Sequence, residues 1–208
     1  MIVVFVGPSL ARARARDALP AADVRAPARR GDIAAAADDG AHTIVLIDGY
    51  LIHDYPPSPM EIHDVLRRGV RVIGTASLGA LRAVELKPYG MVGAGWVYRQ
   101  YAEGGVDRDD EVVVACDRRD GHAVTVPLIN IRYGLQNLYW RRQLAPDQAA
   151  EAFARVSALY LEDRTTQTIR DELAPLLGEP TVEALLSPTY DIKAQDAIQT
   201  LMHVEYAR

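Results

Sequence analysis

The sequence predicts an α/β protein with a mainly parallel sheet, flanking helices, a β-hairpin near residues 111–128 and a C-terminal helical region. In the first half, short Val- and Ile-rich runs alternate with helical patterns, which is typical of a parallel sheet. In the second half, apolar residues recur at helical spacing between prolines. We therefore expect an α/β core over 1–128 and a helical region over 129–208, which packs on the core or shares a single domain with it.

The expected core begins with a buried strand over 2–7 (IVVFVG), which a Gly-Pro turn joins to a helix over 8–19. A short helix over 33–41 (IAAAADDGA) leads to a second strand over 42–49 (HTIVLIDG), which ends at an Asp-Gly pair. Strand and helix thus alternate from the start of the chain.

The next helix, over 58–69, has the clearest start signal in the sequence. Ser58 is placed as the N-cap, Pro59 takes the first helical position and Glu61 follows three residues after the cap. A glycine ends this helix, and a third strand follows over 70–74 (VRVIG).

The pattern changes after the third strand and its helix. The segment 110–128 (DEVVVACDRRDGHAVTVPL) predicts two antiparallel strands joined at Asp120-Gly121. Amphipathic helices are expected beyond residue 129, with breaks at Pro146, Pro175 and Pro188.

Composition argues against several classes of function. The net charge is -5, whereas nucleic-acid binding favours a basic surface. The single cysteine, Cys116, excludes an internal disulfide and a cysteine zinc cluster, and no nucleotide-binding glycine motif occurs, so we expect neither metal nor cofactor. The start MIVVFVG does not resemble a signal peptide, and no apolar run approaches the roughly 20 residues that span a bilayer, so we expect a cytoplasmic protein. The five histidines lack metal-ligand spacing: His42, His53, His63, His122 and His203.

Polar groups follow each of the three expected strands. They lie in Gly7-Pro8-Ser9, in Asp48-Gly49-Tyr50 and in Gly74-Thr75-Ala76-Ser77. Functional groups of parallel sheets collect at the carboxyl ends of the strands. We therefore expect these three segments to meet at one edge, provided that the strands are neighbours.

Ser77 stands where the third strand turns into a helix, and three interpretations remain open. The hydroxyl caps the helix, holds an anion beside the helix N-terminus, or acts as a nucleophile. The placement resembles a nucleophile elbow, but the G-x-S-x-G signature is absent, because the chain reads TASLG at 75–79.

Lys87 and Lys193 are the only lysines and hence the only amine bases among the side chains. Lys87 follows Ser77 by ten residues, which on one straight helix means a rise of ~15 Å and a rotation of about 280°. Spacing alone therefore does not produce a Ser-Lys pair, and an ordinary surface lysine is the simpler interpretation of either residue.

Three further polar residues have both a structural and a functional interpretation. Arg82 and Glu85, three apart on the predicted helix, either pair with each other or leave the arginine to bind a carboxylate. Asp48 either forms the turn after its strand or orients a base or donor.

Six segments in order resemble the TfuA-like family over residues 3–137: VFVGPSL, VLIDGY, VRVIGTASLGALRAVEL, YGMVGAGWVY, DDEVVV and VPLINIRYGL. The resemblance implies an unusual α/β fold and a partner of YcaO enzymes, which exchange a peptide amide oxygen for sulfur in the biosynthesis of modified peptides. It also implies help with peptide engagement and release of sulfide from a thiocarboxylated carrier protein of the ThiS type.

The family's proposed site is hydrolase-like and is built on a serine and a lysine. Ser77 matches the serine, while Met60 stands in the segment SPMEI where many relatives carry the lysine. The resemblance therefore leaves Lys87, another base or a reduced hydrolytic role as alternatives. Asn130 and Arg132 match another family segment, and they either line the site or a partner surface or, for Asn130, end a strand.

These observations give two main hypotheses and a third. In the first hypothesis, the chain is a thiocarboxylate hydrolase that uses Ser77 and Lys87, and the residues near the substrate are Asp48, Arg82, Glu85, Asn130 and Arg132. In the second, it is a non-catalytic module that docks on the YcaO enzyme and its peptide. A general small-molecule hydrolase is disfavoured, because the nucleophile signature and a histidine at triad spacing are missing.

Overall fold

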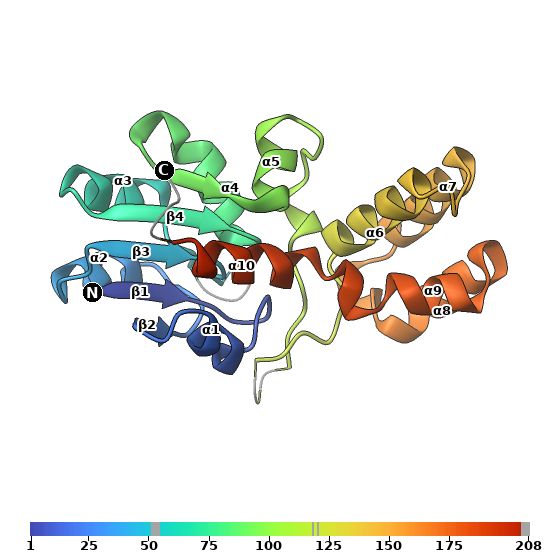
Figure 1. Ribbon diagram of the computed structural model, residues 1–208, viewed down its shortest axis with the longest axis horizontal. Coiled ribbons are helices and arrows are strands. Elements are labelled where there is room, and N and C mark those ends of the chain that lie inside the picture. Colours follow the sequence, from blue (N-terminus) through green and yellow to red (C-terminus); the bar gives the residue numbers. More distant parts are fainter. Residues whose placement is uncertain (51–54, 118, 120, 205–208) are drawn as a thin grey trace. The chain divides into compact units, whose positions relative to one another are not determined.

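The computed structural model describes the chain apart from residues 51–54, 118, 120 and 205–208 (Figure 1). The chain divides into two compact units, one formed by 1–108 together with 193–208 and the other by 109–192. The first unit has the α/β architecture and the second is helical. The final helix therefore belongs to the α/β unit, although it follows the helical one in sequence.

A parallel sheet of five strands forms the centre of the first unit, in the order β2-β1-β3-β4-β5. The parallel sheet predicted from the sequence is thus confirmed. Its strands are β1 (Ile2–Phe5), β2 (Ala22–Arg25), β3 (Thr43–Leu46), β4 (Arg71–Thr75) and β5 (Val92–Ala94).

The three strands expected from the apolar runs are the central strands β1, β3 and β4. Sequence analysis missed β2 and β5, which form the two edges of the sheet. These edge strands are short and contain at most one buried residue each, so they lack the apolar run that reveals a central strand.

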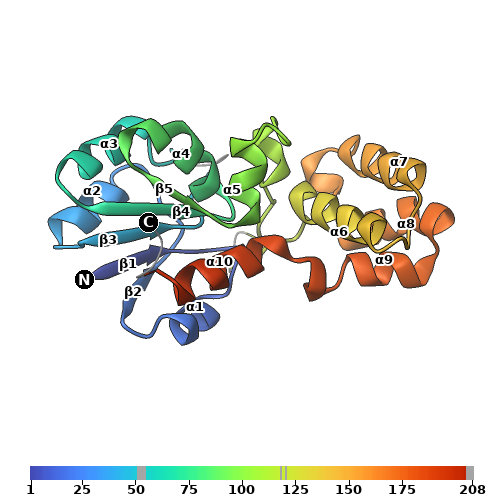
Figure 2. The same cartoon turned by 45° about the horizontal axis from the view of Figure 1, so that its top comes forward.

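Helices cover both faces of the sheet (Figure 2). One face packs against α1 (Arg12–Ala18) and α10 (Ile192–Met202), through a cluster that includes Ala15, Ala194 and Ala197. The other face packs against α2 (Asp32–Asp38), α3 (Pro59–Arg67), α4 (Leu78–Leu86) and α5 (Gly95–Ala102).

Helix α3 begins as its sequence predicts. The hydroxyl of Ser58 accepts a hydrogen bond from the backbone N–H of Glu61 at 3.1 Å, and Pro59 occupies the first turn. The Glu61 carboxylate in turn accepts hydrogen bonds from three backbone N–H groups at the start of α2, those of Gly31, Ile33 and Ala34. Met60, where the family lysine was expected, is 67% exposed on α3.

The second unit buries an apolar core between its helices. Leu128, Ile131, Leu135 and Leu138 follow helical spacing on one side of the first helix and are all buried. The helices are α6 (Leu128–Trp140), α7 (Pro146–Ser157), α8 (Thr166–Leu177) and α9 (Glu179–Leu185).

Two expectations for the second unit need refinement. Pro175 does not break a helix, because it lies within α8, which continues to Leu177 and ends before Gly178. The expected hairpin consists of a short antiparallel pairing of Cys116 with Ala123, with no regular strand in its described part. Asp120, half of the predicted turn, lies outside the described residues.

Among the helices that the structure describes, none combines the length and the apolar character needed to cross a membrane.

Candidate functional site

Asp48 organises the carboxyl edge of the sheet. Its carboxylate is 1% exposed and accepts hydrogen bonds from the backbone N–H groups of Gly7 and Ser9, at 2.8 and 3.0 Å, and from the Ser9 hydroxyl at 2.6 Å. The end of β3 is thereby tied to the loop that follows β1. Asp48, predicted near the substrate, uses both carboxylate oxygens within the protein.

Ser77 follows a strained turn at the end of β4. The Ser77 N–H donates to the Thr75 carbonyl oxygen at 2.7 Å, which closes a three-residue turn around Ala76. Ala76 has φ 65, a left-handed conformation that an L-residue adopts at a cost of about 1–2 kcal/mol. Such strain collects at functional sites, where the surrounding packing holds it.

Two glycines let helix α4 pack directly on the strand ends. A Cβ atom at Gly79 would overlap the carbonyl oxygen of Leu46, and one at Gly74 would overlap the carbonyl oxygen of Gly79. The Gly79 N–H donates to Ile47 at 3.2 Å. The first turn of α4, and Ser77 before it, are therefore fixed against β3 and β4.

The Ser77 side chain is not a helix cap in this structure. Ser77 occupies the N-cap position of α4, but its hydroxyl makes no capping hydrogen bond, unlike the hydroxyl of Ser58. The residue is 5% exposed, and no hydrogen bond joins its hydroxyl to the part of the chain that the structure describes. Of the three interpretations of Ser77, side-chain capping is the one that the structure excludes.

The other predicted residues of α4 point to different roles. Arg82 donates from Nε to the Pro57 carbonyl oxygen at 2.9 Å and from Nη1 to both carboxylate oxygens of Glu85. This pairing is the structural alternative that the sequence left open. Lys87 follows α4 and is exposed, so the helix separates it from Ser77 by ten residues, or ~15 Å of rise.

Asn130 and Arg132 lie in the second unit, on α6. Asn130 is therefore in a helix and does not end a strand. Its side-chain amide donates to Asp191 at 3.0 Å. Arg132 makes a two-pronged ion pair with the buried carboxylate of Glu111 and stacks over the ring of Phe153.

Sequence analysis missed the contribution of α10 to the carboxyl edge. The hydroxyls of Thr200 and Thr75 lie 3.1 Å apart, so α10 meets the end of β4. One turn earlier in α10, Asp196 accepts hydrogen bonds from the backbone N–H groups of Trp96 and Val97, at 2.9 and 2.8 Å. Those two residues follow the end of β5, so the N-terminal part of α10 extends beyond the carboxyl edge.

Lys193 lies one helical turn before Asp196 and Ala197 and is 2% exposed. It was expected in the helical region but belongs to the α/β unit. Ala194 and Ala197, close to this lysine in α10, belong to the same apolar cluster as Ala76. Of the two lysines, Lys193 lies on the helix whose Thr200 contacts the end of β4.

Burial raises the pKa of Asp196 above the ordinary value of 3.8. Desolvation is the largest cause, and the two backbone N–H groups and the charge of Arg99 oppose it without cancelling it. A carboxyl group with this environment links the docking of α10 to pH.

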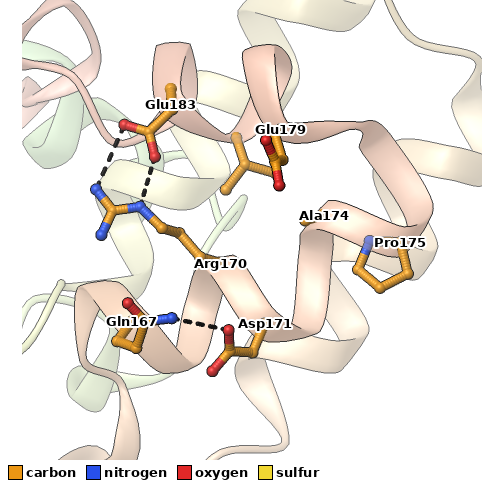
Figure 3. Close-up of a pocket in the computed structure, with 8 residues that line it drawn as sticks. Gln167, Arg170, Asp171, Ala174, Pro175, Glu179 and Glu183 are labelled. Atoms are coloured by element: carbon orange, nitrogen blue, oxygen red, sulfur yellow. Dashed lines mark hydrogen bonds and ion pairs between the residues drawn. The ribbon is translucent and has the colours of Figure 1, made fainter.

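A groove of about 660 Å³ opens in the second unit between α8 and α9. Figure 3 shows Arg170 paired with Glu183 on one side and Gln167 bonded to Asp171 on the other. None of the residues predicted for the site lines this groove. In the described part of the chain, no group of three or more histidine, cysteine, aspartate or glutamate side chains is arranged to hold a metal ion; His53 is outside that part.

A family model described as TfuA-like protein matches residues 48–165, which is more than half of the chain. The chain belongs to the TfuA-like family. Among curated proteins, no match was found. The family segment contains Asp48, Ser77 and Arg82, but α10 lies outside it, so Lys193 is a feature of this TfuA-like chain that the family match does not cover.

Proposed function

We propose that this TfuA-like protein releases sulfide from a thiocarboxylated carrier protein of the ThiS type for use by a YcaO enzyme, with Ser77 as nucleophile. The observation that carries the proposal is the hydroxyl of Ser77, held after a strained turn and left unused as a cap. The TfuA-like family is associated with YcaO enzymes, which supports the partner. The anionic end of a carrier tail also suits the positive end of the α4 dipole beside Ser77.

Lys193 is the base that best fits this proposal. Thr200 contacts Thr75, and Lys193 precedes Thr200 by two helical turns, or about 10.5 Å of rise. Ser77 follows Thr75 by two residues, through the turn around Ala76. Lys193 is therefore the lysine on the helix that contacts the end of β4, whereas Lys87 lies at the far end of α4 from Ser77.

The reaction then balances in two steps. The amine takes the Ser77 proton as the oxygen attacks the thiocarboxylate carbon; the C–S bond breaks, the amine returns the proton to sulfur, and hydrosulfide leaves an acyl ester on Ser77. Water, deprotonated by the same amine, attacks the ester and regenerates the serine and a carboxylate. The net change converts a thiocarboxylate and water into a carboxylate, hydrosulfide and a proton.

The covalent intermediate is the direct test. A synthetic peptide ending in Gly-Gly-thiocarboxylate is mixed with the protein, quenched in acid and digested, and the Ser77 peptide is examined by mass spectrometry. We expect the acyl mass on Ser77 and its absence in Ser77→Ala. Sulfide release without any adduct, equally fast in Ser77→Ala, would refute the role of Ser77.

A second candidate function is a docking module without hydrolase activity. The observation that favours it is the exposure of aromatic side chains on the second unit, 64% for Trp140 and 79% for Tyr160, because exposed aromatic residues are common anchors at interfaces. Under this alternative, Ser77→Ala supports YcaO-dependent thioamidation with added sulfide as well as wild type, and Trp140→Ala does not.

A further inference from the structure

The loops that follow β1 and β2 meet at the carboxyl edge of the sheet. A Cβ atom at Gly49 would meet both the Leu78 side chain and the Ala28 carbonyl oxygen, and Ala28 pairs with Gly49 as an isolated bridge. A Cβ atom at Gly7 would likewise overlap the ring of Pro27. The loop after β2 therefore touches the loop after β1 and Gly49, and Gly49 in turn lies beside Leu78, the residue that follows Ser77.

Three arginines lie on or directly after these loops: Arg12 at the start of α1, and Arg29 and Arg30 directly after Ala28. All three are exposed. In a chain with a net charge of -5, they place like positive charges around the edge that carries Ser77. We call Arg12, Arg29 and Arg30 the basic rim.

Aromatic rings hold two members of the rim in place. The guanidinium of Arg29 lies over the ring of Tyr50, 4.6 Å from its centre, and that of Arg30 lies over Tyr55 at 5.0 Å. The Arg30 N–H also donates to the Tyr55 carbonyl oxygen at 2.8 Å. Stacked on Tyr55 by one face, the Arg30 guanidinium keeps its N–H edges available to carboxylates.

The two ends of the rim are not neutralised within the described chain. Neither Arg12 nor Arg30 forms an ion pair with a residue that the structure describes. The nearby carboxylate of Asp32 accepts the backbone N–H of Arg29 at 2.8 Å. The rim thus presents positive charge outward, next to a site for an anionic tail.

We infer that the basic rim binds an acidic segment of the carrier protein, immediately before the tail that enters the Ser77 site. This inference rests on the proposed function, which supplies the anionic tail, and it adds the surface that selects the protein to which the tail belongs. Charge complementarity makes the interaction dependent on salt, because exposed charges are screened within about 10 Å at 0.1 M ionic strength.

Two synthetic peptides provide the test. Both end in Gly-Gly-thiocarboxylate; one has four glutamates at the fourth to seventh residues from that end, and the other has four glutamines there. Sulfide release gives KM, and fluorescence anisotropy gives affinity independently of the chemistry. The variants are Arg12→Glu/Arg30→Glu and the control Arg67→Glu/Arg141→Glu, which changes the net charge equally at exposed sites on other elements.

For wild type at low salt, we expect the glutamate peptide to bind about two- to thirty-fold more tightly than the glutamine peptide, as two exposed charge pairs allow. The preference disappears in Arg12→Glu/Arg30→Glu and persists in the control variant. Equal affinity of wild type for both peptides, or an unchanged preference in Arg12→Glu/Arg30→Glu, would overturn the inference.

The same data separate the inference from the proposed function. Sulfide release without a preference for the glutamate peptide contradicts the basic rim and leaves the hydrolase intact. A preference in binding without sulfide release supports the rim as an acidic-segment site and contradicts the hydrolase.

Discussion

Replacing Asp48 by asparagine separates a structural role of this residue from a role at the substrate. The buried carboxylate accepts two backbone N–H groups and one hydroxyl. An asparagine of the same size keeps its oxygen toward the two N–H groups and turns its amide toward Ser9, whose hydroxyl then becomes the acceptor. All three hydrogen bonds remain, but none is assisted by charge.

The magnitude follows from the number and type of these bonds. Hydrogen bonds to charged groups contribute about 1.5–3 kcal/mol each, against ~1 kcal/mol for neutral ones. A neutral amide also costs less to bury than a carboxylate, which offsets part of the loss. We expect Asp48→Asn to lower the free energy of unfolding by about 1–3 kcal/mol, and Asp48→Ala to lower it further, because three buried donors then lose their acceptor.

Urea unfolding measures this effect in the α/β unit alone. The chain has two tryptophans, Trp96 in the α/β unit and Trp140 in the helical unit. In a Trp140→Phe background, fluorescence therefore reports the unit that contains Asp48. Ser9→Ala, which removes only the hydroxyl bond, serves as the graded control with a smaller loss.

The structural role of Asp48 also predicts an effect on activity. Folded Asp48→Asn retains wild-type KM for a thiocarboxylated peptide, because the carboxylate serves the β1–α1 loop. A variant that unfolds at the wild-type urea concentration but has a strongly raised KM would refute the structural role and place Asp48 at the substrate.

Three further predictions concern the site and its supports. Lys193→Met lowers the rate of sulfide release at least 100-fold, the scale of general-base catalysis, whereas Lys87→Met, at an exposed site, changes this rate less than two-fold. A larger loss of rate in Lys87→Met than in Lys193→Met would assign the base to Lys87. Ser58→Ala costs about 1 kcal/mol of unfolding free energy, because it removes a helix cap, while Ser77→Ala costs less than ~0.5 kcal/mol; equal losses in urea titrations would mean that Ser77 caps α4. Because the pKa of Asp196 is raised in the folded state, the unfolding free energy that its protonated form contributes is fully present below pH 3.8. This contribution is lost as the pH rises through the folded-state pKa. Wild type therefore loses unfolding free energy relative to Asp196→Asn as the pH increases from 4 to 7, and parallel pH profiles would contradict the desolvation of Asp196.

The sequence predicted the centre of the α/β unit and missed its edges. Buried strands such as β3 are continuous apolar runs, and the N-cap Ser58 marks the start of α3. Both elements could be predicted because local chemistry alone determines them. The edge strands β2 and β5 bury little and carry no such run. Sequence spacing also failed for α10, whose return to the sheet depends on tertiary contacts such as that between Thr200 and Thr75.

The same limit applies to the candidate site. Ser77 was identified because the turn from strand to helix is a local feature of the sequence. Lys193 was treated as a surface residue, since α10 reaches the sheet through contacts such as that of Thr200 with Thr75, 125 residues apart, for which the chain offers no local signal. Arg82 and Glu85 were correctly seen as a potential pair, because both lie on one helix at i,i+3 spacing.

The most direct test of the central claim is the rate of sulfide release from a Gly-Gly-thiocarboxylate peptide by wild type and by Ser77→Ala, without a YcaO enzyme. Ser58→Ala is the matched control for loss of a hydroxyl at a helix N-cap. We expect release by wild type and by Ser58→Ala, and a loss of at least 100-fold in Ser77→Ala. Equal release by all three proteins, or none from wild type, would contradict it.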